Sequence, residues 1–492
     1  MLLPSLLSLL LLPSPAVLAV ANFENTAVVR SIELSGTLTH VATTYAAKAL
    51  VGNVKTYSIA LPRLEKERTS FFEVKVKGQN VPLKAEFDWD SFKARDYDVL
   101  RVTLPEPLSV GATMNLVLET VQTRASRPWP EKASQTETQS LKYDFSLFVI
   151  SPYETLVQRT KVKLPHPEVH SFTQPKDVSQ WAQDDAASHI GNVITYGPFR
   201  NFAPSASDVF DEQQTMQIHY PYEYPLVEIA SYHRHAEVSH WGANLNIDDN
   251  IHLRNVGPEL RGHFSRLEHQ KQAYSTKRVS HIIPGMVLHL PAGISNVYYY
   301  DLIGNVSTSH LRTAPAPAKR DARNKQYSTL EMRPRYPMLG GWNYTFTLGW
   351  DSNLADYAGW DTTKSKYVLE VPLMTFVPSS VYTEASISVV LPEGATDVEY
   401  FPPFAPETQS VDTLKTYLDT TGRPRITLAY KNLTDRHALG TIHVTYRVPF
   451  LAHLKKPIAV SIAFMLFFAL GLVGRRVNLE LHSAPGLKQK TL

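Results

Sequence analysis

The feature that most constrains this chain is one long apolar run near its C-terminal end, from Pro457 to Gly474. As a helix, these 18 residues span about 27 Å at a rise of about 1.5 Å per residue. That length matches the hydrocarbon layer of the endoplasmic reticulum (ER) membrane, which is about 27 Å thick. The alternative is a buried core helix, but Phe464, Phe467 and Phe468 make the centre of the run unusually apolar. We predict a transmembrane helix over residues 457–474.

The N-terminal segment has the features of a signal peptide. Residues 2–20 are apolar apart from three serines and carry no charged side chain, and Ala19-Val20-Ala21 has the small-x-small form of a signal peptidase site. We predict a signal peptide over residues 1–21 that is cleaved after Ala21; the alternative is an uncleaved N-terminal anchor. Cleavage places residues 22–456 in the lumen and residues 475–492 in the cytosol.

The segment after the apolar run is basic. Residues 475–492 hold four Lys and Arg residues against Glu480, an excess that agrees with the positive-inside rule. Lys488 and Lys490 stand fifth and third from the C-terminal end, a spacing that resembles the dilysine retrieval signal of ER type I proteins. We predict a single-pass type I protein of the ER membrane with most of its chain in the lumen.

Charge and cysteine content exclude several classes of protein. The whole chain has a net charge of +3, and residues 475–492 alone carry four positive charges minus one, so the rest nets to zero. A neutral luminal part gives no argument for nucleic acid binding. There is no cysteine, which excludes disulfides, thiol oxidoreductases, cysteine nucleophiles and Cys-type zinc sites.

The luminal part is typical of strands rather than helices. Segments such as 28–34 and 386–391 alternate or are rich in β-branched residues, and prolines and glycines interrupt the chain often. Residues 178–187 form one short helix candidate, with Asp177 as its N-cap. We predict a mainly β fold (β-rich α+β).

A faint internal repeat divides the luminal part. Residues 30–35 resemble residues 234–239, and residues 161–165 resemble residues 388–392. Chance matching of common strand residues is the alternative. We predict two tandem β-sandwich-like domains, over residues 22–228 and 229–450.

No motif for catalysis or for a cofactor is present in the sequence. His233, His235 and His240 are the best metal candidates, but on a strand His240 would point away from the other two, so we expect surface histidines and no metal site. Asp248 and Asp249 are adjacent and would face opposite ways on a strand; we interpret them as turn or cap residues. We therefore expect no catalytic, cofactor or metal residues.

Three Asn-x-Ser/Thr sequons lie before the apolar run, at Asn305, Asn343 and Asn432. In the lumen each is a candidate for N-glycosylation.

Several ordered blocks are similar to the ribophorin I family. The signature block is 237–245, with Ser239, His240, Trp241, Gly242 and Asn244. Further blocks of the same resemblance stand at 196–199, 262–266, 299–309, 334–342 and 419–424. Together they cover about residues 27 to 450.

The resemblance implies a non-catalytic subunit of the oligosaccharyltransferase complex, which transfers a preassembled oligosaccharide from dolichyl diphosphate to Asn in Asn-x-Ser/Thr of nascent polypeptides. It implies partners: the other subunits, including a multi-span catalytic subunit, and nascent polypeptides as acceptors. The 18-residue tail is short, as in fungal members, which argues against ribosome docking by this chain. The alternatives are an ER membrane-tethered cargo receptor or chaperone, and a luminal hydrolase.

Overall fold

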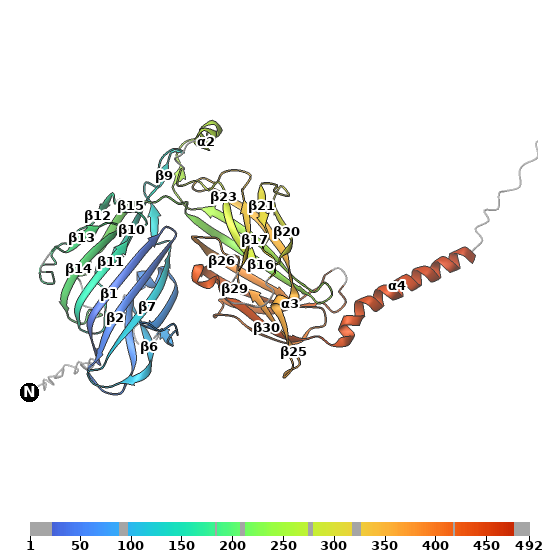
Figure 1. Ribbon diagram of the computed structural model, residues 1–492, viewed down its shortest axis with the longest axis horizontal. Coiled ribbons are helices and arrows are strands. Elements are labelled where there is room, and N and C mark those ends of the chain that lie inside the picture. The colour runs from blue at the N-terminus through green and yellow to red at the C-terminus, as the bar shows by residue number, and fades with distance from the viewer. Residues whose placement is uncertain are drawn as a thin grey trace, which may run out of the picture.

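The computed structural model describes residues 22–87, 97–182, 185–206, 212–273, 279–316, 326–416 and 419–476. These residues form two β-rich bodies followed by a long helix (Figure 1). We name the body that holds β1 to β15 the first unit and the body that holds β16 to β30 the second unit. The predicted mainly β fold with one C-terminal apolar helix is confirmed.

The first unit contains one large sheet and two small ones. The large sheet has the order β13-β14-β11-β1-β2-β7-β4, and the small sheets have the orders β3-β6-β5 and β12-β15-β10-β8. The strands are β1 (Phe23–Ser35), β2 (Leu38–Ala49), β3 (Val54–Pro62), β4 (Thr69–Val76), β5 (Ala85–Phe87), β6 (Tyr97–Leu108), β7 (Thr113–Thr123), β8 (Ser126–Pro128), β9 (Lys132–Ala133), β10 (Ser140–Ser146), β11 (Thr155–Lys163), β12 (Ser171–Phe172), β13 (Ala187–Ile190), β14 (Val193–Phe202) and β15 (Thr215–Pro221).

The second unit contains the same set of sheets. Its large sheet has the order β20-β23-β17-β16-β26-β29-β28, and its small sheets have the orders β19-β22-β21 and β24-β25-β30-β27. The strands are β16 (Val227–Ser239), β17 (Asn244–Asn255), β18 (Glu259–Leu260), β19 (Met286–Pro291), β20 (Ser295–Asp301), β21 (Ser309–Arg312), β22 (Tyr327–Met332), β23 (Asn343–Asn353), β24 (Ala358–Asp361), β25 (Lys366–Pro372), β26 (Ser380–Val390), β27 (Thr396–Phe401), β28 (Thr408–Leu414), β29 (Arg423–Leu433) and β30 (Thr441–Arg447).

The two units share one topology. Each large sheet has a central parallel pair, β1 with β11 in the first unit and β16 with β26 in the second. In these pairs Ile32 lies opposite Val162, and Ala236 lies opposite Val389. Equivalent residues of the two units are separated in sequence by 236 minus 32 and by 389 minus 162 positions. The two resemblances found in the sequence have the same separations. The faint repeat in the sequence therefore marks strands that hold equivalent places in the two sheets.

Each unit buries its core between the large sheet and its two small sheets. In β2 and β17, buried and partly exposed residues alternate, so one face of each strand points inward. In the first unit, Ile32 of the large sheet packs with Tyr143 of β10, and Tyr45 packs with Tyr57 of β3. Burying one such side chain contributes roughly 1.5–3 kcal/mol. Because the chain has no disulfide, this apolar burial is a main source of its stability.

The two units contact each other at two places. At one place Leu38 of β2, Val121 of β7 and Val381 of β26 form a small apolar cluster, and at the other β9 pairs with β18 in parallel. β16 begins at Val227, two residues before the predicted start of the second domain. The assignment of residues 22–228 and 229–450 as separate domains stays a prediction.

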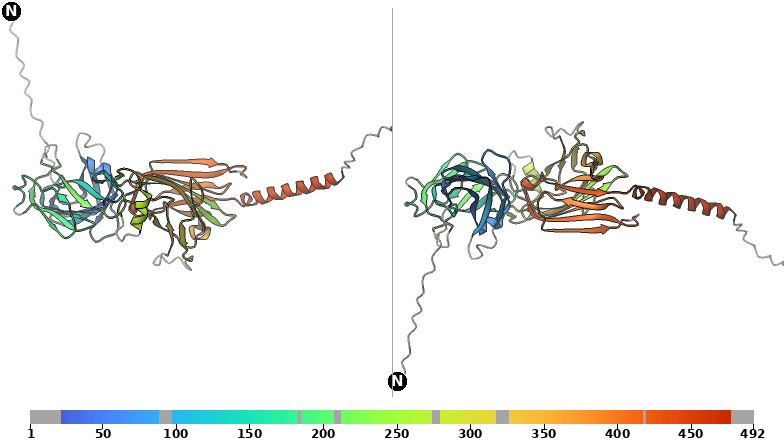
Figure 2. Two further views of the ribbon diagram at one scale, coloured as in Figure 1. Left: turned by 90° about the horizontal axis from the view of Figure 1, so that it is seen from above. Right: turned by 90° about the horizontal axis from the view of Figure 1, so that it is seen from below.

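The described residues form few helices. The short ones are α1 (Arg63–Arg68), α2 (Arg266–Ala273), α3 (Leu354–Tyr357) and the 3-10 helix η1 (Asp435–His437). α4 (Phe450–Arg476) contains the predicted span and buries none of its residues. It is long and apolar enough to cross a membrane and projects from the second unit, away from the first, in every view (Figures 1 and 2).

The predicted helix over residues 178–187 is wrong. Val178 to Trp181 form a turn, and Ala187 already belongs to β13. Trp181 stacks on Phe202 with ring centroids 5.4 Å apart, so tertiary packing overrides the local helical pattern.

Candidate functional site

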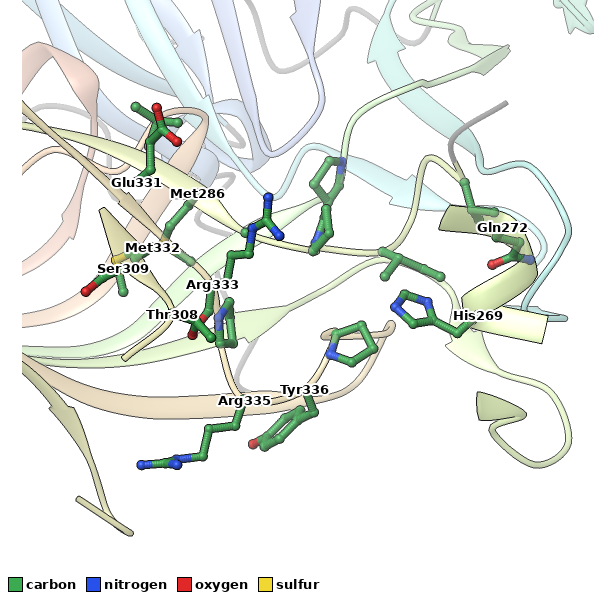
Figure 3. A pocket seen from close by; sticks show the side chains of 18 of the residues that line it. His269, Gln272, Met286, Thr308, Ser309, Glu331, Met332, Arg333, Arg335 and Tyr336 are labelled. Carbon is green, nitrogen blue, oxygen red and sulfur yellow. The ribbon is translucent and has the colours of Figure 1, made fainter. Parts of the chain in front are cut away.

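The second unit contains a groove of about 1130 Å³ (Figure 3). It lies where the ends of β19, β21 and β22 meet α2 and the segment that connects the two units. Its lining comes from four stretches of chain and from two α2 residues: 223–225, 279–287, 307–310, 331–337, His269 and Gln272.

Apolar and aromatic side chains make up much of this groove. Met286 and Met332 lie on its wall, and the rings of Tyr224 and Tyr336 are 64% and 40% exposed. Arg333 supplies a positive charge on the same lining. A groove with exposed rings, one partly exposed methionine and strand ends suits an extended polypeptide.

A network beside the groove fixes the loop that carries the first sequon. The Arg335 guanidinium donates to the Asp301 carboxylate and to the carbonyls of Gly304 and Asn305, the latter two at 3.0 and 3.1 Å. Tyr344 Oη also donates to Asp301, at 3.1 Å. These bonds, led by the one from Arg335, lower the pKa of Asp301 to about 2. The blocks 299–309 and 334–342 of the family resemblance are thus in contact through Asp301 and Arg335.

The three sequons lie in different environments. Asn305 and Asn343 are exposed, and the Asn343 carbonyl accepts a 2.8 Å hydrogen bond from Tyr336 of the groove. Asn432 is partly buried, and its Oδ1 accepts a 3.0 Å hydrogen bond from Arg124 of the first unit.

The family signature is the turn between β16 and β17, and it packs against α4. The His240 imidazole lies 2.8 Å from Tyr446 Oη through its Nε2, and its ring centroid is 5.4 Å from that of His453 on α4. Burial, together with the nearby His453, lowers the pKa of His240 to about 4, so the imidazole is neutral at neutral pH. Trp241, the next residue, is 64% exposed.

The other signature residues hold the turn in shape. Ser239 Oγ accepts a 3.0 Å hydrogen bond from the Gly242 amide, and Asn244 Nδ2 donates to Asp351 at 2.9 Å. These contacts fix the conformation of the turn, and His240 within it packs against His453 of α4. The sequence pattern does not reveal this role, because Tyr446 and His453 lie more than 200 positions away from the signature.

The adjacent acids of β17 are not turn or cap residues. Both lie inside the strand, and Asp249 is fully buried against Arg234, with Nε–Oδ1 and Nη2–Oδ2 distances of 2.7 and 2.6 Å. Asp248 accepts a 2.8 Å hydrogen bond from Tyr298. The two acids form structural contacts on opposite faces of β17.

The remaining predicted site residues stand as follows. His235 lies 4.0 Å from Glu237, and within the described ranges no three His, Asp or Glu side chains converge as they would on a metal ion. Ala21, Lys488 and Lys490 lie outside the described residues.

Comparison with known proteins places this arrangement in a family. Residues 23–474 match the family model described as "Ribophorin I". The chain is 32% identical over 378 residues, 76% of this chain and 72% of the relative, to dolichyl-diphosphooligosaccharide–protein glycosyltransferase subunit 1B of Oryza sativa subsp. japonica. It is 28% identical over 459 residues, 93% of this chain and 72% of the relative, to subunit 1 of the same enzyme in Caenorhabditis elegans.

Likeness to solved structures is weak. Native leukotriene A4 hydrolase from Saccharomyces cerevisiae matches with a TM-score of 0.25 and 13% identity, over 44% of this chain and 31% of that one, which is too little for any argument. The family model, in contrast, covers both units and nearly all of α4. The chain therefore belongs to the ribophorin I family.

Proposed function

We propose that this chain is a non-catalytic, membrane-anchored subunit of an oligosaccharyltransferase complex, which transfers a preassembled oligosaccharide from dolichyl diphosphate to Asn of Asn-x-Ser/Thr. The observation that carries the proposal is the family match over residues 23–474, with relatives named as subunit 1 or 1B of that glycosyltransferase. We assign the chemistry to a different, multi-span subunit. In this chain the polar clusters around Asp249 and Asp301 serve packing and loop geometry.

Purification in a mild detergent tests the assignment. A tagged chain is expected to recover the multi-span subunit and oligosaccharide transfer to a sequon peptide. A parallel preparation without the multi-span subunit is expected to show no transfer. Transfer by this chain alone, or recovery without any partner subunit, contradicts the proposal.

We further propose that the protein is a single-pass type I protein of the ER membrane, with both units in the lumen. The support is α4, whose apolar stretch fits one bilayer crossing and is followed by Arg475 and Arg476. Replacing both Lys488 and Lys490 by Ala is expected to reduce retrieval to the ER. Unchanged localisation would mean that assembly with partners retains the chain instead.

We propose that the groove of the second unit holds acceptor polypeptides near the multi-span catalytic subunit of the complex. Its Tyr224 and Tyr336 rings and its partly exposed Met286 side chain offer contacts that many sequences satisfy. Photo-crosslinking residues at Tyr224 and Tyr336 are expected to capture nascent chains that carry sequons. Tyr327, 50% exposed on the same unit but outside the groove lining, is the matched control. Equal capture at all three positions contradicts the proposal.

The groove also favours a second candidate, a tethered chaperone or cargo receptor. The two roles differ in timing, because a chaperone keeps its clients after their sequons are glycosylated. Pulse-chase crosslinking from Tyr224 separates them. Crosslinks that end when glycosylation is complete support the subunit role, and crosslinks that persist support the chaperone.

A further inference from the structure

We propose that the end of the second unit from which α4 leaves lies in the lipid headgroup layer, with Trp241 and Trp360 as its anchors. This inference rests on the proposed membrane span of α4 and adds a second contact between protein and bilayer. The proposed contact is with lipids at the membrane interface, and it is independent of the function proposed for the groove.

A row of aromatic rings connects Trp360 to α4, and Trp241 is the chain neighbour of one member of that row. Trp360 of β24 packs on Tyr367 of β25 with centroids 4.7 Å apart, and Tyr367 packs on His240 at 4.6 Å. His240 in turn lies 5.4 Å from His453 of α4 and directly precedes Trp241. Packed side chains therefore hold Trp360 near the first turns of α4, and the chain bond to His240 holds Trp241 there.

The depth of this row follows from helix geometry. His453 precedes Pro457, where the apolar run begins, by four residues, or about 6 Å of helix. Each headgroup region is roughly 5–8 Å thick, from the difference between the whole bilayer and its hydrocarbon core. A ring that touches His453 therefore lies at headgroup depth when the apolar run fills the hydrocarbon layer.

Ion pairs fix the direction in which α4 leaves the unit. Lys455 Nζ lies 3.3 Å from Glu393, and Lys456 Nζ lies 2.8 Å from Asp419. The Glu393 and Asp419 side chains are 7% and 0% exposed. Because the acids are held within the unit, insertion of α4 orients the unit as well.

The exposed side chains at this end match the headgroup layer. Trp241 is 64% exposed and Trp360 is 52% exposed, while Phe450 and Leu451 at the start of α4 are 74% and 78% exposed. Tryptophan has an apolar ring and a polar N–H, and it is enriched where hydrocarbon meets water. The exposed Lys364 follows Trp360 in the turn to β25, where an ammonium group can meet lipid phosphates.

Single-cysteine labelling tests the proposal, because the chain has no cysteine of its own. An environment-sensitive fluorophore is placed at W241C, at W360C, and at W129C as a control in the first unit, where Trp129 is 44% exposed. The full chain, assembled with its partner subunits, is put into phosphatidylcholine nanodiscs that contain headgroup-spin-labelled lipid. Labels at 241 and 360 are expected to be quenched at least about twofold more than the label at 129. T362C, beside Trp360, repeats the measurement with both tryptophans in place.

Two outcomes overturn the inference. Quenching at 241 and 360 equal to that at 129, with full access to iodide, means that this end lies in water. Protection from both iodide and spin-labelled lipid means that another protein covers it. A label at F467C with chain-labelled lipid reports on α4 itself: no quenching there refutes the membrane span, whereas quenching at 467 alone refutes only the headgroup contact.

Discussion

Two arginines occupy matching positions at the cores of the two units. Arg234 and Arg30 are 2% and 4% exposed, and they lie 204 positions apart on the equivalent strands β16 and β1. Each donates to a carbonyl at the end of an equivalent strand: Arg234 to Pro372, at 2.7 Å, and Arg30 to Ser146. Each arginine therefore connects the large sheet to a small sheet of its own unit.

Replacing Arg234 by Met is expected to destabilise the second unit by about 3–5 kcal/mol, because the Asp249 carboxylate is left buried without its ionic partner. Adding Asp249→Leu removes that unpaired charge and is expected to restore most of the loss. Denaturant titration of the full chain in detergent measures both free energies of unfolding. A double variant no more stable than the single one contradicts the argument.

His240 makes stability depend on pH. Its pKa is about 4 in the folded chain, below the ordinary value of 6.5, so the unfolded state takes up the proton first as pH falls. The contribution of His240 is therefore complete above pH 6.5 and is lost as pH falls towards 4. Between pH 7.5 and pH 5 we expect a loss of about 1 kcal/mol, discounted because the ring is only partly buried.

The variant His240→Gln is expected to lose less stability over that interval than the unmodified chain. The groups that face the ring, Tyr446, Tyr367 and His453, are unchanged in it. Part of the slope remains, because burial also lowers the pKa of His437 to about 4. If stability changes with pH equally in the two proteins, His240 is excluded as a source of the pH dependence.

Sequon occupancy is a further prediction for single residues. Asn305→Gln and Asn343→Gln are each expected to remove one glycan, seen as a gel shift that glycosidase treatment abolishes, because both side chains are exposed. Asn432→Gln is expected to cause no shift. A glycan there would lie beside the Arg124 contact between the units, and the sequon's Thr434 is fully buried. A lost glycan in Asn432→Gln contradicts this assignment.

At the scale of secondary-structure elements, sequence periodicity predicts the features that depend only on neighbouring residues. The strands around 28–34 and 386–391, the apolar helix and the repeat of β1 in β16 all follow from short patterns. The helix predicted at 178–187 failed because Trp181 packs on Phe202, a contact invisible to local propensity. The groove was missed for the same reason, since its lining combines residues from 223 to 337.

Glu393 is one of two nearly buried carboxylates that attach α4 to the second unit. Glu393 Oε1 accepts from the amides of Thr420 and Thr421, both at 2.9 Å, and from Lys455 of α4. Glu393→Ala removes these hydrogen bonds and is expected to cost about 1–2 kcal/mol, because the exposed donors can bond to water instead. A spin label at Leu451, 78% exposed on the first turn of α4, is expected to become more mobile.

Glu399→Ala is the matched control for this element. Glu399 also pairs with a lysine, Lys366 at 3.0 Å, but its side chain is 56% exposed. An exposed pair contributes about 0–1 kcal/mol, so little change in stability or label mobility is expected. Equal effects of the two substitutions would mean that Glu393 does not hold α4.

At the scale of the whole molecule, two copies of one topology are joined side by side. Arg124 of the first unit donates to Glu228, Thr383 and Asn432 of the second, at 2.6, 2.5 and 3.0 Å. The apolar cluster of Leu38, Val121 and Val381 lies at the same boundary. The Arg124 side chain is 42% exposed, so the buried cluster is expected to contribute more than the arginine to holding the units together.

Replacing Val381 by Asp is therefore expected to loosen the boundary, because a carboxylate is buried among apolar side chains without a partner. Spin labels at the exposed positions Val110 and Leu302 report the distance between the units, and the distribution of this distance is expected to broaden. A label pair at Leu302 and Val411, both in the second unit, is the internal control and keeps its distance if that unit stays folded. An unchanged distance between the units would mean that the remaining contacts, among them the β9–β18 pairing and the Arg124 hydrogen bonds, hold them without the cluster. Broadening of the control pair would instead locate the damage within the second unit.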